Sequence, residues 1–113
     1  MMKTLEYELT PQDVETFLFA LSVFQNYSFD GVPPVQQMIN NKCCDRALDK
    51  LCTGDTNITP NELRIMSASL SLVSCILQGQ IVADDNTKKL CSKYRFSVNE
   101  LLPIFDGFVE SNL

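Results

Sequence analysis

Histidine and tryptophan are absent from this chain, and glycine is scarce. Without histidine, the chain lacks the usual base of nucleophilic catalysis and the commonest metal ligand. The four glycines are scattered, which excludes a glycine-rich phosphate loop. The carboxylates lie near predicted helix starts or on predicted solvent faces, without metal-ligand spacing. We therefore expect no enzyme activity and no catalytic, cofactor-binding or metal-binding residues.

Long apolar runs are also missing. The longest apolar-rich stretch, residues 65–77, is interrupted by serines at positions 67, 69, 71 and 74, and it is too short to span a bilayer. The start of the chain does not resemble a secretory signal, because Glu6 and Glu8 interrupt any apolar segment there. These features predict a cytoplasmic protein that makes no membrane contact.

Cysteine is present in an odd number, five, so complete pairing into disulfides within one chain is excluded and free thiols are expected. No Cys-x-x-Cys motif occurs. The simplest interpretation is that the cysteines act as small apolar side chains with a structural role. However, Lys42 and Arg46 flank the adjacent Cys43 and Cys44, and such cations lower a thiol pKa. An alternative hypothesis is therefore a thiol-based redox or metal-responsive regulator that uses Cys43, Cys44 and Cys52.

The remaining composition is that of a globular protein. The chain has 113 residues, of which 45% are hydrophobic and 20% charged, and this predicts one domain over residues 1–113. Thr-Pro pairs at positions 10–11 and 59–60 are typical helix starts, because threonine caps and proline fits the first helical position. Apolar residues follow both pairs at helical spacing.

Weaker signals predict the other helices. One is expected over about 34–52, with Asn40–Asn41 as a point where it could break. Asp84 or Asp85 is expected to cap a short helix, and Ser97 with Glu100 forms the pattern of a capping box. The predicted fold is an all-α compact bundle of four to five helices, with a short extended N-terminal arm packed on the helices.

The helix that starts at Thr59 carries two apolar rows. Two rows are more than the single face that a surface helix buries. We therefore expect this helix to be central in the bundle or to face a second subunit, which would make the protein a homodimer through this helix.

Charge is unevenly distributed along a chain of net charge −5. The first 41 residues are acidic, whereas Lys88, Lys89, Lys93 and Arg95 form a basic segment without acidic residues. The acidic balance argues against nucleic acid as a partner and favours a basic protein. The basic segment predicts either a solvated helix face or a contact with an anion.

The segment 27–34 mixes turn residues with aromatic and apolar ones. Such a loop predicts either an anchor for a partner or a lid on the core, and Tyr27, Phe29, Asp30 and Val32 are the candidate partner-binding residues. Together these features predict a small acidic protein-binding module without catalytic activity, of the inhibitor, immunity-type or adaptor and regulatory kind.

Overall fold

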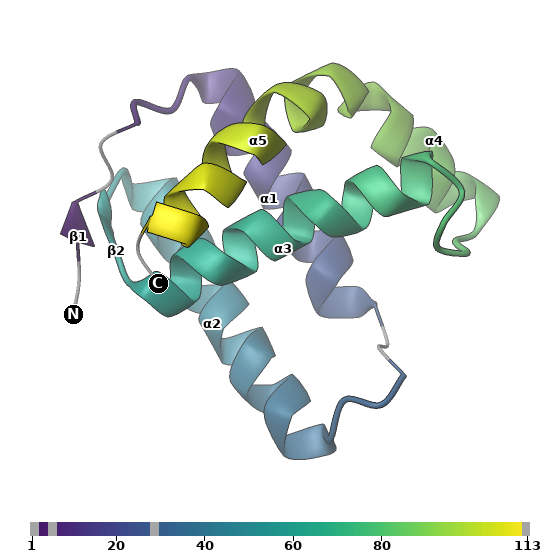
Figure 1. The fold of residues 1–113 in the computed structure, drawn as a ribbon, viewed down its shortest axis with the longest axis horizontal. Helices are drawn as coiled ribbons and strands as arrows, with labels where there is room; N and C mark the ends of the chain where they lie inside the picture. The colour runs from purple at the N-terminus through teal and green to yellow at the C-terminus, as the bar shows by residue number, and fades with distance from the viewer. Residues whose placement is uncertain (1–2, 5–6, 28–29, 112–113) are drawn as a thin grey trace.

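The computed structural model describes residues 3–4, 7–27 and 30–111. In this part of the chain lie the helices α1 (Pro11–Asn26), α2 (Pro34–Thr53), α3 (Pro60–Leu77), α4 (Asp85–Lys93) and α5 (Arg95–Ser111), together with the two-residue strands β1 (Lys3–Thr4) and β2 (Asn57–Ile58) (Figure 1). The predicted all-α bundle is confirmed.

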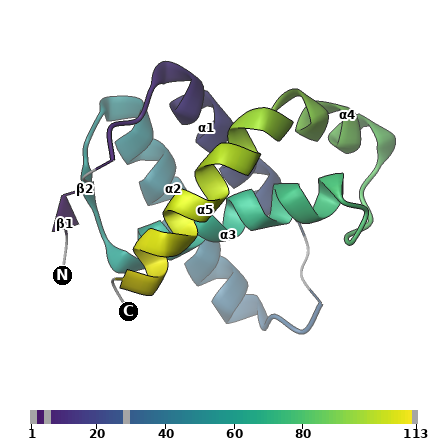
Figure 2. The ribbon, with the colours of Figure 1, turned by 45° about the horizontal axis from the view of Figure 1, so that its top comes forward.

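Helix α3 is the centre of the bundle and contacts all four other helices, with α5 crossing it obliquely (Figure 2). Most residues of its two apolar rows are buried, among them Met66, Leu70 and Val73, which are fully enclosed. The small serines between the rows let neighbours approach, and the Ser67 hydroxyl donates to the Asp106 carboxylate of α5. Among the described helices, none is long and apolar enough to cross a membrane.

The burial of α3 bears on the dimer prediction without testing it. That prediction required an apolar face that the chain itself leaves uncovered. Only Asn61, Arg64 and Ala68 of this helix are exposed, so the other helices of the same chain already cover its apolar rows. Ala68 is the one apolar residue among these three, so α3 offers little apolar surface to a second copy. A homodimer through this helix stays a prediction.

Both Thr-Pro starts form the predicted caps. Thr10 accepts a hydrogen bond from the Asp13 amide at 3.1 Å, and the Asp13 carboxylate accepts one from the Thr10 amide at 3.0 Å. Thr59 and Glu62 make the same reciprocal pair at the start of α3, at 3.1 and 3.2 Å. These bonds satisfy amides that a helix leaves unpaired at its first turn.

The start of α5 and the N-terminal arm differ from the predictions. The Tyr94 carbonyl accepts from the Val98 amide at 2.9 Å, so α5 begins at Arg95, directly after α4, and Ser97 is buried inside the helix rather than capping it. In the arm, Lys3 and Thr4 pair antiparallel with Ile58 and Asn57, a partner that the sequence did not suggest.

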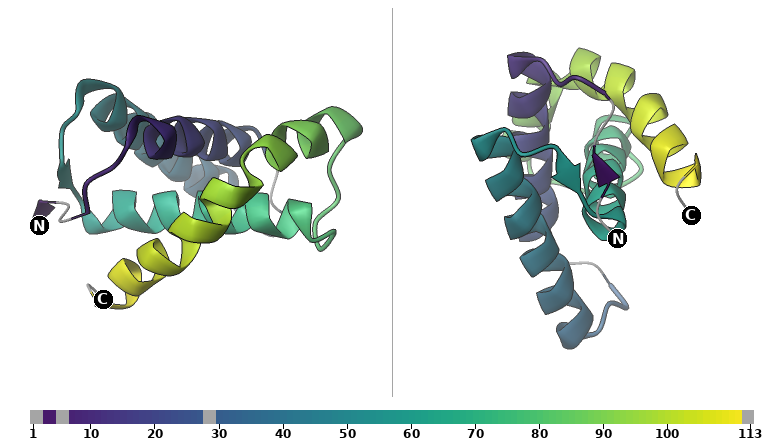
Figure 3. Two further views of the ribbon diagram at one scale, coloured as in Figure 1. Left: turned by 90° about the horizontal axis from the view of Figure 1, so that it is seen from above. Right: turned by 90° about the vertical axis from the view of Figure 1, so that its left-hand side faces the viewer.

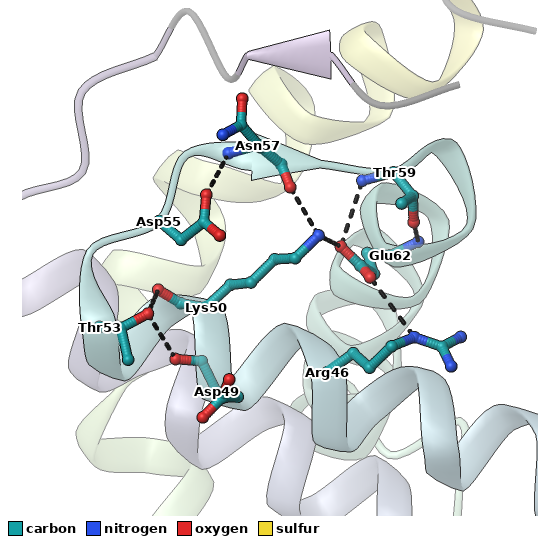
Figure 4. A network of polar contacts seen from close by, with 8 residues as sticks. All are labelled: Arg46, Asp49, Lys50, Thr53, Asp55, Asn57, Thr59 and Glu62. Atoms are coloured by element: carbon teal, nitrogen blue, oxygen red, sulfur yellow. Dashed lines mark hydrogen bonds and ion pairs between the residues drawn. The ribbon is translucent and has the colours of Figure 1, made fainter.

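A buried ionic network joins α2 to α3 (Figure 4). Glu62 is only 1% exposed, and its carboxylate lies 2.6 Å from the Lys50 ammonium and 3.6 Å from Arg46. Lys50 also donates to the Asn57 carbonyl at 2.6 Å. The C-terminal half of α2 is thereby held to both β2 and the first turn of α3.

Removal of Lys50 is expected to destabilise the fold far more than removal of Arg46. Lys50→Met leaves the Glu62 carboxylate buried without its closest cation, at a cost of about 3 kcal/mol in the free energy of unfolding. Arg46 is 59% exposed, so Arg46→Met should cost less than about 1 kcal/mol. Urea unfolding followed by circular dichroism measures both. Similar losses for the two variants would contradict the assignment of the pair Lys50–Glu62 as the principal contact.

Candidate protein-binding surface

Helix α2 consists of two halves with different surroundings. Its buried residues are Cys43, Cys44, Ala47 and Leu51, all in the C-terminal half. The N-terminal half, residues 34–42, contains no buried side chain and projects beyond the other helices (Figure 3). This half of α2 is therefore a surface feature rather than part of the core.

Three apolar side chains line one face of the projecting half. Val35, Met38 and Ile39 are 69%, 60% and 52% exposed. Residues three and four apart are neighbours on a helix, so these side chains form one stripe, here called the apolar ridge. Residues 31–41 carry no charge, so the ridge lies in an uncharged stretch of an otherwise charged helix.

The projecting half stays helical without core packing because local contacts support it. Pro34 occupies the first helical position, where its fixed φ suits a helix. Asn40 and Asn41, the predicted point of a break, accept hydrogen bonds from Gln36 and Gln37 at 3.0 and 3.1 Å. The helix therefore continues through this pair and presents the ridge on a defined backbone.

The loop residues predicted to bind a partner lie beside this half of α2. Tyr27 and Val32 are half-buried and line a hollow of about 280 Å³ together with Pro34, Gln37 and Asn41 of α2. Asp30 is exposed, and Phe29 lies outside the described residues. The structure thus brings Tyr27 and Val32 to the N-terminal half of α2, on a side of the helix that does not include the ridge residues. The sequence analysis did not single out the ridge residues as a surface. The sequence does contain an apolar triplet in an uncharged stretch. The same pattern is equally expected of residues that pack in the core.

A larger groove adjoins the hollow. It has a volume of about 540 Å³ and lies between the C-terminal half of α1, the segment before α4, and α4 itself. We call it the α1–α4 groove. Its apolar lining comes from Phe19, Val23, Ile76, Val82, Ala83 and Leu90. Asn26 and Tyr27 line both the groove and the hollow.

The thiols predicted to be reactive are buried. Burial raises the pKa of Cys44 to about 11, and the neighbouring Cys43 and Asp45 act in the same direction. Burial also raises the pKa of Cys43, even though the nearby Arg46 opposes the shift. A reactive thiol is favoured by exposure and a lowered pKa, and Cys43 and Cys44 have neither. The thiol-based regulator stays a prediction.

The alternative of a metal-responsive regulator has no geometric support either. Cys52 is exposed, whereas Cys43 and Cys44 are buried. Among the described residues, no group of three or more potential metal-ligating side chains lies together.

The basic segment is exposed on α4 and at the start of α5. Lys88, Lys89, Lys93 and Arg95 all face solvent, and none forms an ion pair within the part of the chain that the structure describes. The Tyr94 hydroxyl in the same segment donates to Glu15 at 3.2 Å. An anion contact at these four cations stays a prediction.

The acidic residues expected to attract a basic partner are partly engaged within the chain. Asp13 belongs to the cap of α1, and Glu15 accepts the hydrogen bond from Tyr94. Glu6 lies outside the described residues. The apolar ridge is thus the more distinctive surface.

Comparison with protein-family models, curated proteins and solved structures finds no match for this chain.

Thiol titration of the native protein is expected to detect Cys52 first. Cys52 is exposed and Cys75 half-buried, whereas Cys43, Cys44 and Cys91 are buried. An aromatic disulfide reagent at pH 8 should therefore react fast with one thiol and reach all five only in denaturant. Cys52→Ser should abolish the fast phase. A fast phase that persists in Cys52→Ser would show that another thiol of the folded protein is reactive.

Alkaline pH is expected to destabilise the fold through Cys44. Its folded pKa of about 11 lies above its usual value of 9.0, so the unfolded chain releases this proton first as the pH rises. The free energy of unfolding therefore falls between pH 9 and pH 11. Urea unfolding across this range should show a shallower fall in Cys44→Ala than in the wild type. Identical slopes would contradict the shift.

Proposed function

We propose that this chain is a non-catalytic protein-binding module of the cytoplasm, and that the apolar ridge is its contact surface. The observation that carries the proposal is the exposure of Val35, Met38 and Ile39 on a helical segment that the core does not need. Its five free thiols fit a reducing compartment.

The spacing of the ridge matches one mode of peptide recognition. An amphipathic helix that binds in a groove contacts it through residues at positions i, i+3 and i+4. In this chain those positions are Val35, Met38 and Ile39. Burial of such side chains contributes roughly 1 kcal/mol or more each. Because the backbone is already helical, little conformational entropy is lost on binding.

The chemistry expected of the partner follows from the absence of charged residues along the ridge. A charged group placed against Val35, Met38 or Ile39 would lose its water without gaining a counter-ion. The complementary surface is therefore an apolar groove without net charge, rather than the basic surface that the acidic composition suggested. Inhibitors, immunity-type proteins and adaptors act in this way, by occupying a partner's surface without performing chemistry on it.

Site-specific photocrosslinking in the native host tests the proposal. A photoreactive residue at Met38 should yield an adduct of discrete mass, whereas the same residue at exposed Gln80 should not. The captured protein is then purified and its dissociation constant measured. Met38→Asp should weaken binding at least about tenfold, while unfolding stability changes by less than about 0.5 kcal/mol.

Gln36→Asp is the control for added charge, because it places the same charge on the same exposed helix but off the ridge. It also removes the hydrogen bond to Asn40, so circular dichroism compares the helix content of both variants. It should leave the dissociation constant within about twofold of the wild type. Equal adducts from positions 38 and 80, or equal affinities for Met38→Asp and Gln36→Asp, would refute the ridge as the contact surface.

A further inference from the structure

A separate cavity lies at the C-terminal half of α2, away from the ridge. It has a volume of about 290 Å³ and is lined by residues 7–9 of the N-terminal arm, the start of α1, the last turns of α2 and the segment between α2 and α3. We call it the arm cavity. Small-molecule sites occupy about 300–1,000 Å³, so this cavity has room for a small ligand and not for a folded partner.

Half of the arm cavity is apolar, and that half is rigid. Leu51 and Ile58 belong to the core, at 8% and 5% exposure. The Tyr7 ring packs edge-on against Phe105 of α5, with ring centroids 6.1 Å apart. Because the core holds these walls in place, an apolar ligand body meets a preformed surface. The apolar lining residues are Tyr7, Leu9, Val14, Leu51 and Ile58.

The other half of the lining carries negative charge. Glu8 and Asp55 both line the cavity and are both exposed. The Asp55 carboxylate accepts a hydrogen bond from the Asn57 amide at 2.9 Å (Figure 4). Within the part of the chain that the structure describes, neither carboxylate forms an ion pair. A cation at the mouth of the cavity would therefore meet two carboxylates without a counter-ion of their own.

Lys50 is the one positively charged residue among the described lining residues, and its charge is already balanced. Its ammonium lies 2.6 Å from the buried Glu62 carboxylate and donates to the Asn57 carbonyl (Figure 4). An ion pair this close cancels most of its own field at a distance. The net potential in the cavity is therefore set by Glu8 and Asp55.

The end of α2 adds to this negative potential. Helix α2 has 20 residues and ends at Thr53, directly before Gly54, which lines the cavity. The aligned peptide dipoles of a helix place partial negative charge at its C-terminus. A Cβ atom added at Gly54 would meet no other atom within 4 Å, so a ligand has room to approach this backbone.

We propose that the arm cavity binds a small organic cation, an ammonium group on an aromatic or aliphatic body. The body packs against Tyr7, Leu51 and Ile58, and the ammonium group lies at the mouth with Glu8 and Asp55. A metal ion fits less well, because Ca²⁺ takes more oxygen ligands than two carboxylates provide. No group of three or more potential metal ligands lies together in the described ranges. This site adds small-molecule binding to the proposed function and does not depend on the ridge.

Titration of the isotope-labelled full chain with phenethylamine, followed by amide chemical shifts, tests the site. This probe carries both an aromatic body and an ammonium group. Shifts should appear around Leu51, Gly54 and Ile58, with a dissociation constant of about 1 mM or lower. Propylamine lacks the aromatic body, and phenylpropionate carries the opposite charge. Each should bind at least about tenfold more weakly than phenethylamine.

Glu8→Gln removes one charge at the mouth without changing the apolar walls. It should weaken phenethylamine binding about fivefold and leave the binding of phenethyl alcohol, the neutral analogue, unchanged. Glu100→Gln is the matched control, because Glu100 is also exposed but does not line the cavity. It changes the net charge by the same amount and should bind phenethylamine like the wild type.

Three results would overturn the inference. The first is the absence of shifts around the cavity at about 10 mM phenethylamine. The second is propylamine or phenylpropionate binding as tightly as phenethylamine. The third is an equal loss of affinity in Glu8→Gln and Glu100→Gln. None of these results bears on the ridge, whose test uses crosslinking from Met38.

Discussion

The buried carboxylate of Glu62 is the contact on which the arrangement of this protein depends. This side chain completes the cap of α3 and accepts a hydrogen bond from the Lys50 ammonium of α2. The same ammonium donates to the Asn57 carbonyl of β2. A carboxylate at 1% exposure is tolerated only when such partners surround it. Because they do, α2 is held at its C-terminal half, and its N-terminal half is free to project.

The projecting half explains why the molecule has a distinctive surface at all. The core is built around α3, and it is complete without the first turns of α2. No apolar residue on those turns is buried in the core, yet Val35, Met38 and Ile39 are there. Scattered exposed apolar residues are ordinary, whereas a contiguous uncharged stripe on a preformed helix is a feature of binding surfaces.

Burial also decides which chemistry the chain retains. Cys43 and Cys44 lie next to cations in the sequence, and the charge of Arg46 acts to lower the pKa of Cys43. Burial of both thiols outweighs that cation, so their pKa values are raised rather than lowered. The neighbourhood of a residue along the chain indicated one property, and its neighbourhood in space produced the other.

The elements with local signals could be predicted from the sequence. The caps at Thr10 and Thr59 and the central position of α3 were predictable, because a cap needs only residues three apart and a central helix needs two apolar rows. The start of α5 was missed, because Ser97 is drawn into the core. Which apolar residues are buried depended instead on how the helices pack together. Val35 and Leu51 read alike in the sequence, but one faces solvent and the other the core, since burial depends on the segments that fold back to cover each position.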